Sequence, residues 1–77
     1  MTLAEHRKQR GLSQIEAAHE LGLKSRTTIW QIENGMDAAA DLALKIEEWS
    51  NGAVRADTIS RVIARARAAP EPSGAAA

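Results

Sequence analysis

The sequence predicts an all-α fold of five short helices, and three observations support this. Helix-forming residues dominate the 77 residues, and runs of β-branched residues are absent. Apolar residues recur at steps of three and four, which is the period of a helix with one buried face. Single glycines interrupt the chain at intervals of eleven to seventeen residues, so each segment fits one short helix; they are Gly11, Gly22, Gly35 and Gly52.

The first two helices are bounded by recognisable start and stop residues. A helix is expected over about residues 2–10, ending at Gly11. The next helix is expected to begin after Ser13, which acts as its N-cap and forms a capping box with Glu16. It ends at Gly22, and small alanines at 17 and 18 would let another helix approach closely. The apolar positions that recur on one face of this helix are Ile15, Ala18 and Leu21.

A third helix is predicted from about Ser25, as its N-cap, to Asn34, where Asn34-Gly35 ends it. Ile29 and Ile32 are its inward positions, which leaves a polar outer face. A fourth helix is expected from near Asp37 to the Asn51-Gly52 pair, with a core stripe of Ala39, Leu42, Ile46 and Trp49.

The last helix is expected over residues 57–69, after a short extended connection at residues 53–56. Asp57 would cap it, and one side carries the apolar residues Ile59, Val62, Ile63 and Ala66. Residues 1–69 are therefore predicted to form a single domain. Residues 70–77 offer nothing to bury and are expected to be a disordered tail.

Composition disfavours several classes of function. Ten basic residues balance ten acidic ones, but basic residues exceed acidic ones before residue 32 and after residue 52, while residues 32–52 are acidic. This polarity is expected if one face meets phosphate, and also for ordinary solvated helices. Cysteine, glycine-rich phosphate loops and nucleophile motifs are absent, so we expect no enzyme, no metal and no cofactor. No apolar run resembles a signal peptide or a membrane span, which favours a soluble cytoplasmic protein.

The informative unit is a short capped helix, a glycine turn and a second short helix with a polar outer face. Here the sequence resembles the Cro and phage-repressor helix-turn-helix family, also called the XRE family, over about residues 3–52. One departure is the segment between Gly22 and Ile29, which is one residue longer than is usual in that family, at Leu23-Lys24. The segments that carry the resemblance are Leu12-Ser13-Gln14, Ala17-Ala18, Leu21-Gly22, Thr28-Ile29 and Ile32-Glu33-Asn34-Gly35.

The resemblance implies a lambda-repressor-like fold that places the helix from Ser25 to Asn34 in the major groove of double-stranded DNA. It matches three residues to base-reading positions, namely Arg26, Thr27 and Gln31. Positions that usually meet phosphate are matched by Gln14, Ser25, Thr28 and Asn34, while Lys24 and Arg10 are added from charge and location alone. The alternatives are that Ser25 is first a helix cap and that the base-reading candidates are solvated surface.

Two further features of this unit concern structure. Arg7 and Glu33 match positions that commonly form an internal ion pair in this family, so a structural role is favoured for them. Trp30 stands where the family usually has a polar residue. We expect it to be buried against protein; contact with a thymine methyl or sugar, and contact with a partner, are the alternatives.

One reading helix covers too few base pairs for selectivity, so proteins of this type usually pair and read a palindrome. The last helix is the expected dimerisation element, through Ile59, Val62, Ile63 and Ala66, with packing on its own core as the alternative. The segment at residues 51–54 resembles the linker of small Cro-like and YdaS-like regulators. These features favour a homodimeric repressor of a palindromic operator, autoregulatory and associated with a phage or mobile element, including the anti-CRISPR-associated type. The alternative is an antitoxin-like protein-interaction module that binds a partner such as a toxin and contacts DNA secondarily.

Overall fold

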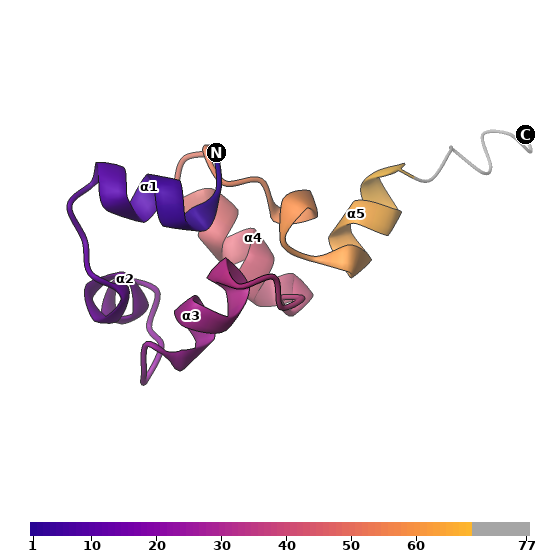
Figure 1. Cartoon of the computed structure of the whole chain (residues 1–77). Helices are drawn as coiled ribbons and strands as arrows, with labels where there is room; N and C mark the ends of the chain where they lie inside the picture. Colours follow the sequence, from indigo (N-terminus) through magenta and orange to yellow (C-terminus); the bar gives the residue numbers. More distant parts are fainter. Residues whose placement is uncertain (69–77) are drawn as a thin grey trace, which may run out of the picture.

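Five α-helices and one 3-10 turn make up residues 1–68, the part of the chain that the computed structural model describes. No strand occurs within these residues, so the predicted all-α class is confirmed. The predicted tail at residues 70–77 lies outside the described part. The turn between α2 and α3 and the helix α5 lie at opposite ends of the molecule (Figure 1). The elements are α1 (Leu3–Gln9), α2 (Gln14–Glu20), α3 (Thr27–Glu33), α4 (Ala40–Trp49), η1 (Ala56–Thr58) and α5 (Arg61–Ala68).

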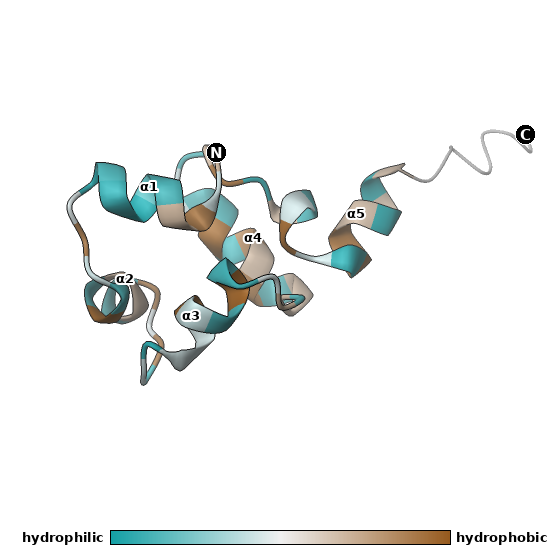
Figure 2. Ribbon diagram, viewed as in Figure 1, coloured by the Kyte–Doolittle hydropathy of each residue, from teal (hydrophilic) through white to brown (hydrophobic). Residues whose placement is uncertain are grey.

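The core is built from small and aliphatic side chains that all the elements except α5 supply as fully buried residues. Ala17, Ala18 and Ala43 are completely inaccessible, which lets short helices approach one another closely. In Figure 2 the most hydrophobic segments of α3 and α4 lie close together near the centre of the molecule. The larger buried side chains are Leu3, Leu21, Ile29, Ile32, Ile46 and Val54.

Capping boxes start the first two helices. The Ser13 hydroxyl accepts a hydrogen bond from the backbone N–H of Glu16, and the Glu16 carboxylate accepts one from the backbone N–H of Ser13, as predicted. Thr2 and Glu5 form a second box at α1. Ile15 was expected on the buried face of α2, but 48% of its surface is exposed, so the buried face is formed around the two alanines instead.

Helix α4 begins at Ala40, three residues later than the predicted start at Asp37. Its fully buried side chains are Ala43 and Ile46. The predicted stripe is therefore partly wrong: Ala39 is exposed, whereas Leu42 and Trp49 are half-buried against the core. The later start of α4 has a physical reason. The Asp37 carboxylate accepts a hydrogen bond from the start of α5, and Ala39 takes the N-cap position outside α4.

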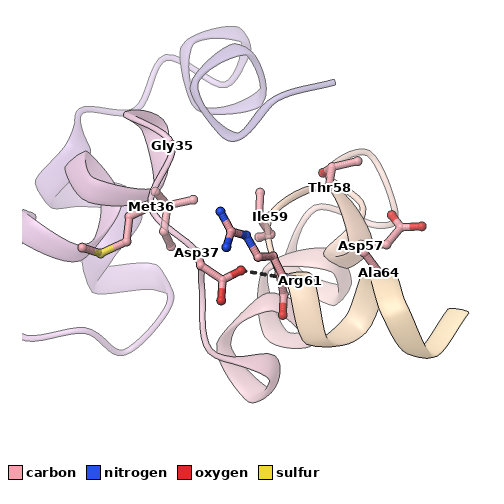
Figure 3. A pocket seen from close by; sticks show the side chains of 10 residues that line it. Gly35, Met36, Asp37, Asp57, Thr58, Ile59, Arg61 and Ala64 are labelled. Carbon is pink, nitrogen blue, oxygen red and sulfur yellow. Dashed lines mark hydrogen bonds between the residues drawn. The ribbon is translucent and has the colours of Figure 1, made fainter. Parts of the chain in front are cut away.

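The last predicted helix is broken into the turn η1 and the helix α5. Asp57 was expected to cap this helix, but it lies within η1 and forms an ion pair with Arg55 at 2.9 Å. Asp37 instead accepts a hydrogen bond from the backbone N–H of Arg61 at 2.6 Å, which satisfies the first turn of α5 (Figure 3). Ala38 donates its N–H to the carbonyl of Ile59 at 2.8 Å, so the loop after α3 is joined both to the end of η1 and to the start of α5.

The connection before η1 contributes to the core, which its expected role as an extended linker did not anticipate. Val54 and Ala56 are fully buried. The hydroxyl of the buried Ser50 accepts a hydrogen bond from the N–H of Val54 at 2.9 Å, which holds this segment against the end of α4. The chain therefore turns back on its own core before α5 begins.

Candidate nucleic-acid interface

A six-residue turn, residues 21–26, connects α2 to α3 and changes the direction of the chain between them. Gly22 has a φ of +76°, a left-handed conformation that glycine adopts without the steric cost of a side chain. Leu23 donates its N–H to the carbonyl of Ala18 at 2.8 Å and packs against the core. Lys24 and Ser25 are exposed on this turn, while Leu23 keeps its contact with the core.

The start of α3 differs from the prediction. Arg26 occupies the N-cap position and Thr27 is the first helical residue, whereas Ser25 had been expected as the N-cap. The Ser25 hydroxyl accepts a hydrogen bond from the N–H of Thr27 at 3.3 Å, so it supports the turn rather than the helix end. Ser25 therefore lies on the exposed part of the turn, beside Lys24.

Helix α3 has one buried face and one exposed face. Ile29 is 0% exposed and Ile32 is 7% exposed, as their spacing predicted. Of the base-reading candidates, Arg26 and Thr27 are exposed, whereas Gln31 is half-buried at the flank. Of the phosphate candidates on this helix and its end, Asn34 is exposed and Thr28 is half-buried, while the Asn34 amide donates to the carbonyl of Trp30 at 2.8 Å.

Arg7 and Glu33 form a bidentate ion pair that joins α1 to α3. The Arg7 Nε lies 2.7 Å from Glu33 Oε2 and its Nη2 lies 3.1 Å from Oε1, as expected from the sequence. Both side chains are largely shielded from solvent, at 12% and 9% exposure. A third nitrogen of Arg7 donates to the carbonyl of Leu12 at 2.9 Å, which fixes the turn before α2. One guanidinium therefore connects the first three helices.

The ion pair continues outward to the exposed face of α3. The Gln14 amide donates to Glu33 at 3.0 Å, and its oxygen accepts a hydrogen bond from Arg26 at 3.2 Å. Burial would raise the pKa of Glu33, but the hydrogen bonds from Arg7 and Gln14 and the charge of Arg7 outweigh it and lower that pKa below its usual value. Gln14, a predicted phosphate contact, is thus also the link that orients Arg26.

The other predicted site residues are divided between two surfaces. Arg10, proposed from charge alone, is engaged with Glu20 at 2.9 Å and stacks over the Trp49 ring at 5.4 Å. Of the predicted dimerisation residues, Ile59 and Ile63 pack against the core of their own chain. Val62 is 62% exposed and Ala66 is also exposed. Two of the four predicted dimerisation residues are therefore used within the monomer, and two remain exposed.

Trp30 is the one residue of α3 whose placement contradicts the sequence-based expectation. It is 52% exposed, so it is not buried against this chain. Its position on the helix could have revealed this, because a residue four after Arg26 and three after Thr27 shares their face. Ile29 and Ile32 are close to Trp30 in the sequence, but they lie on the buried face of the helix.

The described chain therefore presents a capped helix, a tight glycine turn and a second helix with an exposed polar face. The sequence model of the family described as Helix-turn-helix matches residues 3–48, which is more than half of the chain. The chain belongs to the XRE-type helix-turn-helix family. Searches of curated proteins and of solved structures return no match.

In this helix-turn-helix protein, α2 and α3 form the unit that gives the family its name. Proteins of this family are DNA-binding regulators rather than enzymes. The matched region ends within α4, so η1 and α5 lie beyond it. None of the helices in residues 1–68 has the length and apolarity needed to cross a membrane.

Proposed function

We propose that this protein is a homodimeric transcriptional repressor that binds a palindromic double-stranded DNA operator through the exposed face of α3. One observation carries the proposal: Arg26 stands on that face, exposed, and is held by Gln14, which is held in turn by the shielded Arg7–Glu33 pair. A base-reading side chain gains from such support, because less rotamer freedom is lost when it binds.

The chemistry of the α3 face suits the major groove. Arg26 can donate two hydrogen bonds to O6 and N7 of a guanine, and Gln31 can pair with the N6 and N7 atoms of an adenine. Thr27 is the residue after Arg26, and it offers a hydroxyl and a methyl group to a base edge. We assign the specificity of the protein to these three residues.

Phosphate contacts are assigned to the polar residues around the reading face. Lys24 and Ser25 are exposed on the turn before α3, and Asn34 is exposed at its end. Gln14 and Thr28 are half-buried at the flank of the same surface. Because Lys24 is the one cationic side chain among these five residues, they neutralise few phosphates, and we expect a shallow dependence of affinity on salt.

Dimerisation is assigned to the exposed face of α5. Val62 and Ala66 line a shallow apolar hollow on that face, between Arg61 and Arg65. A second copy would cover these residues, and two reading helices would then address the two halves of a palindrome.

The test uses a duplex that the full-length protein enriches from a randomised 20-base-pair library. Replacing Arg26 and Gln31 together with alanine should weaken binding to that duplex by more than a hundredfold at fixed salt, since two base contacts are lost. Arg55→Ala is the matched control, because it removes the same charge from an exposed position beside Asp57 and should leave the affinity unchanged. Equal binding by the double variant would refute the proposal, as would failure to enrich any duplex.

A second function is an antitoxin-like module whose main partner is another protein. It is favoured by the exposure of large apolar side chains on several elements, among them Ile15, Leu44 and Val62. Under this second function the duplex selection would yield no specific sequence.

A further inference from the structure

An exposed tryptophan on the reading face is the least expected feature of this structure. Trp30 leaves 52% of its surface exposed. Trp49, the second tryptophan, is half-buried and donates its indole N–H to Glu20 at 2.9 Å. Tryptophan carries the largest apolar surface of any side chain, so leaving half of it in water forgoes stability that burial would provide.

The surroundings of Trp30 connect it with the base-reading residues. Arg26, Thr27 and Trp30 line one shallow hollow of about 170 Å³ on the outer face of α3. Arg26 is one helical turn before Trp30, so the two side chains lie on the same face. Any double helix that Arg26 and Thr27 contact through their outer face must therefore also meet the indole.

We propose that Trp30 reads a thymine by packing its indole against the C5 methyl group in the major groove. This inference rests on the proposed function and deepens it by assigning a further specificity residue. Thymine is the one base whose major-groove edge carries an apolar group, so an apolar side chain distinguishes it from the other three bases. The hollow beside the ring gives the methyl group a place between the indole and Thr27.

Helix geometry places this thymine close to the guanine assigned to Arg26. Four residues of helix rise by about 6 Å, and stacked bases are separated by about 3.4 Å along a strand. The thymine is therefore expected about two base steps or fewer from that guanine, within the same half-site.

The chemistry around Trp30 favours DNA over a protein partner for this face. A protein partner would be expected to cover a continuous apolar patch, whereas the exposed apolar residues Leu44 and Val62 belong to α4 and α5. The hollow at Trp30 is lined by a guanidinium and a hydroxyl-bearing side chain, both of which can bond to base edges. Isolated methyl groups among polar base edges match this mixed surface.

The experiment replaces each thymine of the selected duplex in turn with deoxyuridine, which lacks only the methyl group. One replacement near the guanine should weaken binding of the full-length protein about fourfold, which corresponds to burial of one carbon. Trp30→Ala should weaken binding of the unmodified duplex about tenfold and should abolish the effect of that deoxyuridine. Leu44→Ala is the control, because it removes an exposed apolar side chain on α4 and should preserve both affinities.

The outcomes separate this inference from the proposed function. If Arg26→Ala weakens binding while Trp30→Ala leaves it unchanged, the inference is wrong and the proposed function stands. If Trp30→Ala weakens binding but every deoxyuridine effect persists in the variant, Trp30 contacts the backbone only and thymine reading is wrong. If no duplex is selected at all, the proposed function is wrong, and the inference about Trp30 is wrong with it. Far-UV circular dichroism of Trp30→Ala should show unchanged helicity, since the side chain is outside the core.

Discussion

Glu33 is the residue on which the reading surface depends most. Its two oxygens accept hydrogen bonds from Arg7 and Gln14, and Gln14 holds Arg26. Because Arg7 and Glu33 are both nearly shielded from water, removing one partner leaves a charge with little solvent to stabilise it. The same carboxylate thus contributes to stability and to the placement of a base-reading side chain.

We predict that Arg7→Ala lowers the free energy of unfolding by about 3 kcal/mol, because it leaves the Glu33 carboxylate shielded and unpaired. Glu33→Gln, which keeps the size of the side chain, should cost less. The pKa of Glu33 is lower in the folded protein than in the unfolded chain, where it is about 4.3, so its contribution is present above that pH and is lost as the pH falls through the folded value.

The measurement is urea unfolding of the wild type, Arg7→Ala and Glu33→Gln at several pH values. Below about pH 4.3 the difference in unfolding free energy between the wild type and Glu33→Gln should shrink. A difference that stays constant down to pH 2.5 would contradict this assignment.

At the scale of elements, the helix starts distinguish a true cap from a supporting turn residue. Ser13 caps α2 through a complete capping box. Ser25 bonds only to the N–H of Thr27 at 3.3 Å and stands outside α3. The two serines are chemically identical, so they form a matched pair for measurement.

Ser13→Ala should lower the free energy of unfolding by about 1 kcal/mol, because the N–H of Glu16 loses its partner at the start of α2. Ser25→Ala should change it by less than about 0.5 kcal/mol, since the residue is exposed and caps no helix. Thermal or urea unfolding of both variants would measure this. Equal losses for the two serines would show that Ser25 acts as a cap after all.

Elements were predicted well where the signal was local. The capping box at Ser13, the glycine turn at Gly22 and the inward phase of Ile29 depend on residues within one or two turns, and each is found in the structure. Helix boundaries were predicted wrongly where a residue distant in the sequence bonds to the expected capping residue. Asp37 was expected to start α4, but it bonds to Arg61, which lies 24 residues later.

The site was less predictable than the helices because its links cross elements. The hydrogen bond between Gln14 and Arg26 joins α2 to the start of α3, and no spacing rule within one helix anticipates it. Helical phase places Trp30 on the face of Arg26 and Thr27, but whether another element covers that face is decided by the packing of the whole fold. Val54 was missed for the same reason, since a short linker becomes core only when Ser50 holds it.

At the scale of the whole molecule, α5 is both a part of the core and a candidate interface. Ile63 of α5 and Ile59, two residues before its start, pack against the core, while Val62 faces solvent. Deleting the segment would therefore uncover the core as well as the surface. A single substitution at the exposed position separates the two effects.

Val62→Lys is expected to raise the dissociation constant of the dimer about tenfold or more, because it adds a cation beside Arg61 and Arg65 in the proposed apolar interface. Sedimentation equilibrium of the full-length protein would measure it. Leu44→Lys is the control, since it introduces the same charge at an exposed position on α4 and should leave the dimer intact. A wild-type protein that sediments as a monomer at all concentrations would contradict the proposed dimer.

The two hydrogen bonds between the loop after α3 and residues 59–61 bear on the geometry of such a dimer. Ala38 bonds to Ile59, at the end of η1, and Asp37 bonds to Arg61, the first residue of α5, so the loop that follows the reading helix is tied to the start of the interface helix. Two chains that dimerise through α5 would then hold their two reading helices at a fixed separation, unlike two domains joined by a flexible linker. With a fixed separation, both helices bind only when the two half-sites are the matching distance apart. The length of the DNA spacer then becomes part of what the protein recognises, although its bases need not be contacted.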